Sequence, residues 1–278
     1  MSGSVSYFRF RDSVERREPH SSPPISLMIA AASCASPAVY RRREVISQCF
    51  ETGHHQRATL RQCLPVDRLA GKAYAAEMAE EIRAGKKADV PRFNGGAPLK
   101  DTTHVSVVDA EGNCVTMTHS LGMPSGVVTS GLGFMYNGCM GVFDPRPGRA
   151  GSLAPGKARF SSVVPSIVWE ADRPHLVIGA PGATQIAMGV LQVMLNALDF
   201  DMTMVEAVSA PRFSATSNAI DVSNRIPRGV ERELGAMGYE VVRSPNTYGF
   251  AAVHAIRVHP DGLDGGADPG RDGIVMAV

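Results

Sequence analysis

A strand–turn–strand pattern constrains the fold of this chain more than any other stretch. His104–Asp109 alternates or runs apolar, Ala110–Asn113 has turn chemistry, and Cys114–Ser120 has the composition of a returning strand. We therefore predict a β-hairpin that begins at Thr102. Pairing of its strands is expected to bring Ser120 back beside Thr102.

The hydroxyl group at the entrance of this hairpin is a candidate nucleophile. Thr Oγ is a weak nucleophile unless a base lies within hydrogen-bond reach. Cleavage of the chain before Thr102 would supply such a base, because the new α-amine, with an ordinary pKa near ~8, can act on its own hydroxyl. The alternative, from propensity alone, is that this β-branched residue only forms a strand.

The Gly-rich turn Gly179–Ala183 is a second candidate site. It follows an expected hairpin of Ser162–Trp169 with His175–Ile178 and leads into an expected helix, Thr184–Leu198, with one apolar face. Backbone N–H groups at a helix N-terminus stabilise developing negative charge, so the turn suits an oxyanion hole. The alternative is a tight turn with no further role.

Six motifs occur in an order that resembles the γ-glutamyltransferase family of N-terminal-nucleophile hydrolases. They are Thr102–Asn113, Gly133–Asn137, Ala154–Ser162, Gly179–Ala183, Ala210–Phe213 and Gly266–Pro269. In that family a precursor cleaves itself before a Thr, which gives a large subunit and a small subunit whose first residue is the nucleophile. The resemblance covers about residues 64–278 and implies cleavage between Asp101 and Thr102.

The resemblance also implies roles for other residues of the site. It makes Ser120 a hydroxyl that supports the nucleophile, and it places the oxyanion hole on Gly182 and Ala183. Ser161 and Ser162 would donate hydrogen bonds to a substrate carboxylate. Ala183 replaces a glycine of the family, a change that keeps the N–H group and preserves the function if φ is negative there.

The chain departs from the family pattern where γ-glutamyl-specific members bind the substrate α-amino group. Val142 replaces their Asp, and Gly122 and Cys139 replace an Asn and a Gln. A buried ammonium without its carboxylate partner is an unpaired charge, which typically costs several kcal/mol. We therefore expect a plain acyl or short dicarboxylic amide to be a better substrate than glutathione.

The order of the expected elements indicates an α+β fold with antiparallel sheets covered by helices. Further helices are expected at Tyr74–Arg83, Met202–Ser209 and Arg228–Met237, and further strands at Val222–Ile226, Glu240–Arg243 and Ala251–Val258. This agrees with the αββα four-layer sandwich of the family, of which the chain would form mainly the small-subunit half. Residues 64–101 would resemble the tail of the large subunit, and residues 102–278 the catalytic small subunit.

Residues 1–63 differ in composition from the rest of the chain. They contain nine arginines, no lysine and several Ser/Pro clusters. Such a segment does not readily offset the entropy lost on ordering, so we expect a disordered or unrelated leader. The apolar run Ile25–Cys34 is too short to span a membrane and lies behind a mixed-charge stretch, unlike a secretion signal. This favours a cytoplasmic over a periplasmic location.

Composition argues against several other classes of function. A formal net charge of +1 gives no basic footprint for nucleic acid or for a membrane surface. The five cysteines are an odd number without CxxC or metal spacing, so we expect neither a disulfide framework nor a metal site. The tail Asp261–Gly273 lacks the register of a calcium loop and is expected to form turns. No cofactor is expected.

Two functions are compatible with these patterns. The first is an amidohydrolase or acyltransferase that uses Thr102 on γ-glutamyl or related acyl amides, together with a large-subunit counterpart from the same precursor or from a separate chain. The second is a catalytically silent fragment or subunit that pairs with a separate large-subunit partner. Cleavage before Thr102 in the purified protein distinguishes them.

Overall fold

The structure is a computed structural model that describes most of the chain from residue 71 onward. Described are residues 68, 71–87, 89–90, 102–148, 151–159 and 161–278, and the backbone of two strands, β1 (Ser4–Arg9) and β2 (Met28–Ser33). These strands pair antiparallel with each other within the predicted leader. The rest of residues 1–63 and the predicted cleavage position Asp101 lie outside the described residues.

The chain divides into two compact units. The first contains Met1–Arg41, Thr102–His119 and Ser162–Val278, and the second contains Arg42–Asp101 and Ser120–Ser161. The first unit therefore holds the predicted nucleophile and the predicted oxyanion turn, and the second holds most positions expected to bind the acyl group. No helix in the described part of the chain is long and apolar enough to span a membrane.

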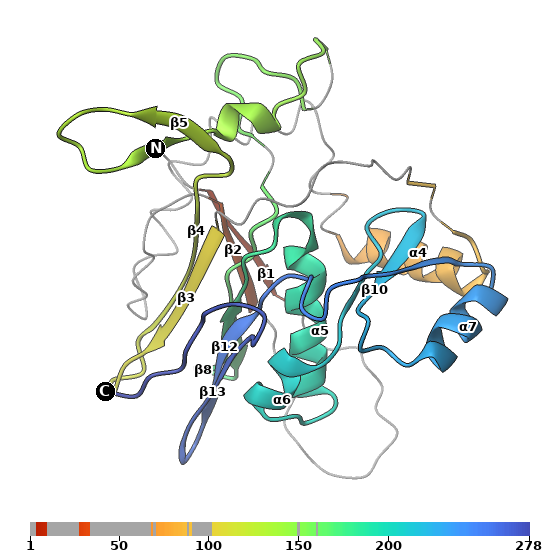
Figure 1. The fold of residues 1–278 in the computed structure, drawn as a ribbon. Helices are drawn as coiled ribbons and strands as arrows, with labels where there is room; N and C mark the ends of the chain where they lie inside the picture. Colours follow the sequence, from red (N-terminus) through yellow and green to blue (C-terminus); the bar gives the residue numbers. More distant parts are fainter. Residues whose placement is uncertain are drawn as a thin grey trace. The chain divides into compact units, whose positions relative to one another are not determined.

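A four-stranded antiparallel sheet organises the first unit, with the strand order β13–β12–β8–β7 (Figure 1). Its strands are β7 (Ser166–Glu170), β8 (Arg173–Gly179), β12 (His254–His259) and β13 (Gly262–Ala267). Successive side chains of β8 enter two different cores, because strand residues alternate between faces. Leu176 and Ile178 belong to the larger core and Val177 to the smaller one.

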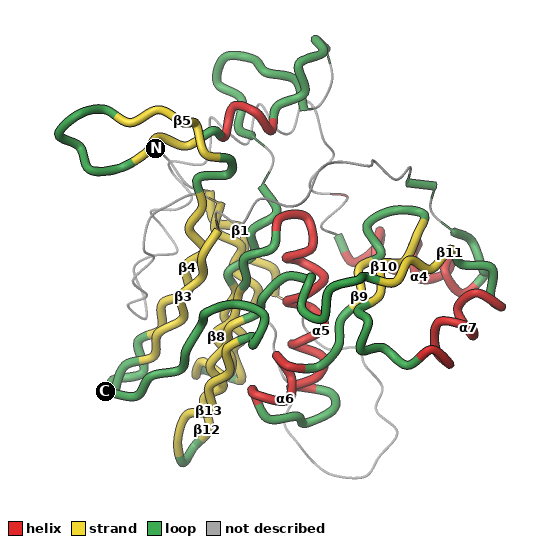
Figure 2. The backbone as a smooth tube through the Cα atoms, in the orientation of Figure 1, coloured by secondary structure: helices red, strands yellow, loops and turns green. Residues whose placement is uncertain are grey.

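Two helices cover one face of this sheet. They are α5 (Ile186–Leu198), which confirms the predicted helix, and α6 (Met204–Ser209) (Figure 2). α5 buries Ile186, Val190 and Val193 at helical spacing against the larger core. α6 begins at a capping box formed by Thr203 and Glu206, which satisfies N–H groups at the helix start.

The predicted hairpin is confirmed and lies against the other face of the sheet. It consists of β3 (Thr102–Val108) and β4 (Cys114–Ser120), and β3 lies next to β8 and β12. Thr116 Oγ1 on β4 donates to the carbonyl oxygen of Ile178 at 3.2 Å. The α+β prediction is therefore confirmed, with three of the four sandwich layers, helix–sheet–sheet, present in this unit.

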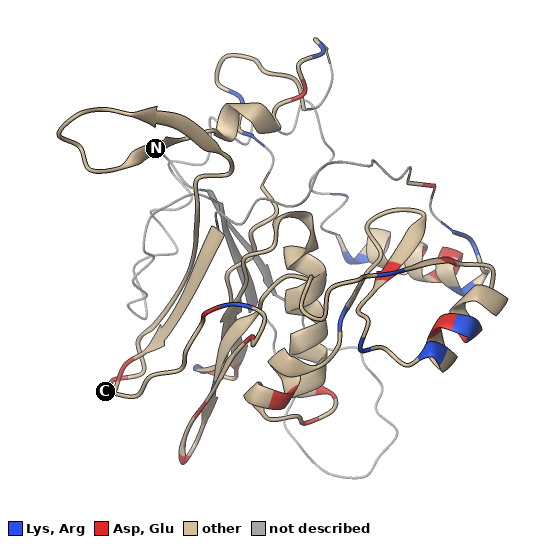
Figure 3. Ribbon diagram, viewed as in Figure 1, with Lys and Arg blue, Asp and Glu red and all other residues tan. Residues whose placement is uncertain are grey.

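The outer face of the hairpin is uncovered and apolar in the described structure. Val105 and Val107 are 41% and 48% exposed, whereas His104, which precedes Val105 and faces the other side of the strand, is buried. Neither β3 nor β4 contains a charged residue (Figure 3). An apolar sheet face of this kind normally packs against another layer.

A smaller sheet completes the first unit and corrects one expectation. It contains β9 (Phe213–Ser214), β10 (Ala219–Val222) and β11 (Glu240–Arg243). β10 and β11 are parallel, not antiparallel, because α7 (Arg228–Ala236) forms the crossover between them.

The strand expected at Val222–Ile226 instead ends at Val222. Ser223–Ile226 form a turn, in which the N–H of Ile226 donates to the carbonyl oxygen of Ser223 at 3.0 Å. The guanidinium of Arg243 donates to three carbonyl groups of this turn, those of Ser223, Asn224 and Ile226. The turn is thus fixed by a side chain from β11, which no local pattern indicates.

The tail expected to form only turns contains the edge strand β13. Asp264 Oδ2 accepts a hydrogen bond of 2.7 Å from the N–H of Met204, the first residue of α6. A Cβ atom on Gly266 would lie 2.5 Å from the carbonyl oxygen of Met204. Glycine therefore permits the start of α6 to pack directly on the strand.

Within its described residues, the second unit contains the helix α4 (Lys72–Arg83) and a small two-stranded sheet. α4 confirms the helix expected from Tyr74, although none of its residues is buried in the described structure. β5 (Pro124–Val128) pairs antiparallel with β6 (Met135–Asn137). The short 3₁₀ helix η1 (Cys139–Val142) follows.

Candidate active site

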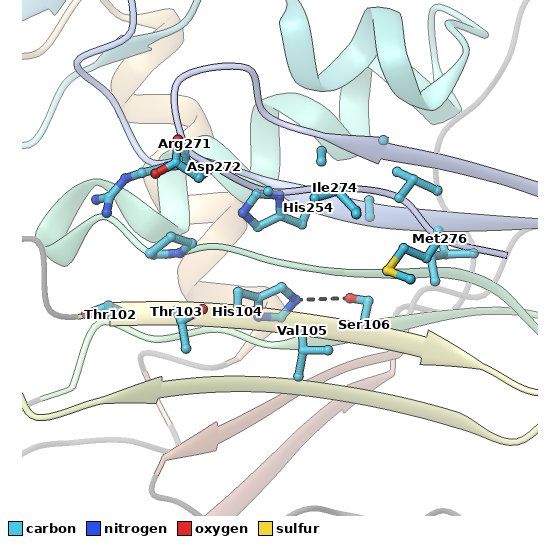
Figure 4. Close-up of a pocket in the computed structure, with 17 residues that line it drawn as sticks. Thr102, Thr103, His104, Val105, Ser106, His254, Arg271, Asp272, Ile274 and Met276 are labelled. Carbon is cyan, nitrogen blue, oxygen red and sulfur yellow. Dashed lines mark hydrogen bonds between the residues drawn. The ribbon is translucent and has the colours of Figure 1, made fainter. Parts of the chain in front are cut away.

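A cavity of about 350 Å³ in the first unit contains the predicted nucleophile (Figure 4). Thr102 and its neighbours on β3 form one wall, and the chain end from Arg271 to Met276 forms another. Pro181, in the middle of the predicted oxyanion turn, also lines it. Thr102 and Pro181 of this turn therefore line one cavity.

His104 forms part of the same cavity, although its ring is buried. Its Nδ1 lies 2.9 Å from Thr118 Oγ1 and its Nε2 lies 3.0 Å from Ser106 Oγ. The ring stacks on that of His254, with the centroids 6.4 Å apart. Burial, with a smaller effect of His254, lowers the pKa of His104 from 6.5 to about 3. The neutral ring has a hydroxyl partner at each nitrogen, so it is not arranged as a base for Thr102.

The His104 ring also lies directly on Gly179, the last residue of β8. A Cβ atom at position 179 would overlap the ring atoms. Thr102 and His104 are two residues apart on β3 and so lie on the same face of that strand. Contact between His104 and Gly179 thus fixes the spacing between the nucleophile strand and the turn that begins at Gly179.

The backbone of the turn differs from the expectation. Ala183 has φ of 53°, not a negative value, and Gly182 has φ of 148°. The helix also does not begin at Thr184, because a 3₁₀ turn, η2 (Ala183–Gln185), precedes α5. A left-handed alanine is strained, and such residues concentrate at functional sites.

The turn presents two N–H groups that are available to a ligand. Those of Gly182 and Ala183 donate to no acceptor within the described residues, whereas the carbonyl oxygen of Gly182 accepts from Gln185 N at 3.2 Å. Ala183 is exposed and Gly182 is partly buried. Two adjacent unpaired donors that follow Pro181, which lines the cavity of the candidate nucleophile, suit an oxyanion, although their catalytic role stays a prediction.

The two serines expected to bind a carboxylate differ in what they contact. Ser161 Oγ is buried and has no hydrogen-bond partner in the part of the chain that is described. A buried hydroxyl without a partner costs about 1–3 kcal/mol, so it calls for an explanation such as a ligand. Ser162 is partly buried. Binding of a substrate carboxylate by these two serines stays a prediction.

The structure brings together three positions of the predicted acyl-group site within the second unit. A Cβ atom on Gly122 would lie 2.8 Å from Cys139 Sγ, and Gly122 has φ of 72°. The N–H of Gly122 donates to Ser120 Oγ at 2.9 Å, and Cys139 Sγ donates to the carbonyl oxygen of Leu121 at 3.4 Å. Val142 ends the 3₁₀ helix that Cys139 begins.

The charges of residues 120–161 do not favour an ammonium ligand. Asp144 is the only acid there, whereas Arg146, Arg149, Lys157 and Arg159 are basic. The carboxylate of Asp144 accepts two 2.8 Å hydrogen bonds from the Arg146 guanidinium. It also accepts one of 2.9 Å from the Arg146 backbone N–H. The one carboxylate of the segment is therefore already paired with a cation.

Sequence reasoning missed several contributors to the site. It assigned nothing to His254 or to the chain end at Arg271–Met276, which line the cavity with Thr102. Two of the six motifs gave a signal for a contact near the chain end. Ala210–Phe213 contains Arg212 and Gly266–Pro269 contains Asp268, and these two residues form a buried ion pair. No group of three or more His, Cys, Asp or Glu residues able to hold a metal ion occurs among the described residues.

Comparisons with known proteins identify related chains. Residues 40–278 match the family described as gamma-glutamyltranspeptidase. The acylase ACY 1 proenzyme of Pseudomonas sp. (strain V22) is 39% identical over 218 residues, which cover 77% of this chain and 39% of that protein. The glutathione hydrolase proenzyme of Pseudomonas aeruginosa is 32% identical over 232 residues, covering 77% and 41%.

A solved structure is similar to this chain over nearly the whole length of the solved chain. The gamma-glutamyltranspeptidase from Pseudomonas nitroreducens complexed with L-DON aligns with a TM-score of 0.58 and 34% identity, over 63% of this chain and 99% of that chain. The present chain spans about two-fifths of the length of the two curated relatives.

Proposed function

The chain belongs to the gamma-glutamyltranspeptidase family, and on this premise we propose that it is an amide hydrolase or acyltransferase whose nucleophile is Thr102 Oγ. Cleavage between Asp101 and Thr102 frees the α-amine of Thr102 to act as its base. One observation carries the proposal: Thr102 and Pro181, at the centre of a turn with two unpaired N–H groups, line the same cavity.

The chemistry follows from these groups. Thr102 Oγ attacks the amide carbonyl carbon and its proton passes to the α-amine, while the N–H groups of Gly182 and Ala183 donate to the tetrahedral oxyanion. Collapse breaks the C–N bond, and the leaving amine takes the proton from the α-ammonium. The acyl group is left as an ester on Thr102. Water or a second amine then attacks this ester and releases the acyl group, with Ser120 as a supporting hydroxyl.

The preferred acyl group carries a carboxylate and no α-amino group, as in glutaryl amides. Val142 offers no charge to an ammonium, and Asp144 is already bound by Arg146. The unpaired Ser161 hydroxyl, with Ser162 after it, is available to donate to a carboxylate. The greater identity to an acylase (39%) than to a glutathione hydrolase (32%) points the same way.

A large-subunit counterpart completes the protein. The chain spans only two-fifths of its curated relatives, and its hairpin leaves Val105 and Val107 exposed where a four-layer sandwich has an outer layer. The counterpart comes from the same precursor or from a separate chain. The same two observations favour the second candidate function, a catalytically silent subunit that only pairs with such a partner.

One experiment distinguishes the two candidates. The chain is purified alone and together with the large subunit of the acylase ACY 1 relative, incubated, and analysed by N-terminal sequencing. The proposal expects a fragment that begins Thr-Thr-His-Val-Ser, hydrolysis of a glutaryl anilide, and loss of both in Thr102→Ala. An uncleaved, inactive chain in a stable complex with the large subunit would support the silent subunit instead.

A further inference from the structure

The methyl group of Ala251 packs against the predicted oxyanion turn from a distant part of the sequence. A Cβ atom on Gly182 would lie 2.5 Å from both Cα and Cβ of Ala251, and one on Gly189 would lie 2.9 Å from the same Cβ. Ala251 itself is fully buried. The predicted oxyanion turn and the beginning of α5 therefore both pack against the Ala251 methyl group.

The next residue holds the other side of the turn. The N–H of Ala252 donates to the carbonyl oxygen of Pro181 at 3.0 Å. Consecutive residues before β12 thus fix Pro181 by a hydrogen bond and Gly182 by steric contact. Ala183 comes next, with φ of 53°, a conformation that costs an alanine roughly 1–2 kcal/mol. Strain of this kind persists only where the surrounding structure determines it.

We propose that Ala251 is a positioning residue for catalysis, whose methyl group holds Gly182 and Ala183 in the conformation that directs their N–H groups at the oxyanion. The inference rests on the proposed function of this turn. Ala251 does not contact the reacting atoms, so it acts only through Gly182. A looser turn would still bind substrate but would stabilise the transition state less, which lowers kcat and leaves KM unchanged.

The kinetic test compares two variants, each of which lacks one buried methyl group. Ala251→Gly removes the contact with Gly182, whereas Ala219→Gly removes a methyl from the start of β10, in the separate small sheet, where Ala219 is 1% exposed. Both variants are measured with a glutaryl anilide in the complex with the large subunit. We expect Ala251→Gly to lower kcat by about tenfold, less than the loss of a whole donor, with KM changed by less than about twofold. Ala219→Gly should change neither value.

A second measurement does not depend on turnover. The N–H of Gln185 donates to Gly182, and that of Ile186 donates to Ala183. Their hydrogen exchange, followed by mass spectrometry on a peptide spanning residues 179–190 of the full chain, reports how firmly the turn is held. We expect faster exchange in Ala251→Gly and parental exchange in Ala219→Gly.

These two measurements separate the inference from the proposed function. Unchanged exchange in Ala251→Gly, or an equal loss of kcat in both variants, would overturn the role of Ala251. A parent complex that hydrolyses no amide would instead refute the proposed function, and the exchange rates would still decide whether Ala251 holds the turn.

Discussion

Arg212 forms a buried ion pair with Asp268, and the pair joins two motifs that lie 56 residues apart. The two side chains are 5% and 2% exposed. Arg212 also donates to the carbonyl oxygen of Val208 at 2.6 Å, and Asp268 accepts from the N–H of Gly270 at 2.7 Å. The pair therefore links the end of α6 to the segment after β13, which continues to the cavity-lining residues Arg271–Met276.

Asp268→Asn should destabilise the chain strongly, because it leaves the Arg212 guanidinium buried without its counter-charge. Removal of one partner of a buried pair typically costs about 3–5 kcal/mol. Urea unfolding measures the loss. The matched control is Asp201→Asn, because Asp201 pairs with Arg257 but is 89% exposed; its cost should stay below about 1 kcal/mol. Equal losses in the two variants would show that the buried ion pair contributes no more to the free energy of unfolding than the exposed one.

The conformation of Ala183 predicts opposite effects for two substitutions. Ala183→Gly should raise the free energy of unfolding by about 1 kcal/mol, because glycine adopts φ of 53° without steric cost. Ala183→Pro should destabilise the chain, since proline fixes φ near about −65°. With a negative φ at position 183, proline would have deleted one N–H donor without distorting the backbone. The observed φ of 53° means that proline would distort the turn as well. Thermal melts of both variants test the sign of each change.

The features predictable from sequence were those set by local periodicity. The apolar–polar alternation of residues 104–120 identified the β3–β4 hairpin, and the helical spacing of Val190 and Val193 identified α5. Thr102 and Pro181, from two stretches that the sequence marked as candidate sites, line one cavity, while the catalytic roles of the site residues stay predictions.

The features that were missed depend on contacts between distant segments. Ala183 adopts a left-handed conformation after Gly182, which packs on Ala251. Gly266 on β13 leaves room for the start of α6 to pack against that strand. The strand expected beyond Val222 gives way to a turn held by Arg243. None of these contacts leaves a periodic signal in the residues whose conformation it determines.

The buried histidine predicts how stability depends on pH. Since the folded pKa of His104, about 3, lies below its ordinary value of 6.5, protons bind more tightly to the unfolded chain. The stability contributed by neutral His104 is thus fully present above pH 6.5 and is lost as the pH falls from 6.5 toward 3. The slope from this residue is at most about 1.4 kcal/mol per pH unit. His104→Gln should flatten the urea-unfolding profile in this range, whereas substitution of the exposed His119 by Gln should not.

Val142 predicts a reversal of substrate preference. In complex with the large subunit, the parent chain should hydrolyse a glutaryl anilide better than a γ-glutamyl anilide. Val142→Asp should raise kcat/KM for the γ-glutamyl compound relative to the glutaryl one by roughly tenfold or more, the scale of one hydrogen bond to a charged group. Val142→Asn is the uncharged control and should change the ratio less. Efficient γ-glutamyl turnover by the parent would mean that another residue binds the amine.

The contact between Gly179 and His104 predicts coupling between the strand of the nucleophile and the oxyanion turn. Gly179→Ala adds a methyl group where the His104 ring lies, so one of them must move, at a cost of about 1–3 kcal/mol. In the double variant His104→Ala removes the ring, so the added methyl group should cost little. The free energies of unfolding of the two substitutions should then be coupled by about 1 kcal/mol or more in urea unfolding. The control is Gly262→Ala on β13, where a Cβ atom meets nothing within 4 Å. Additive free energies would mean that the ring and the turn adjust independently, and His104 would then not set the distance from Thr102 to the donors at Gly182 and Ala183.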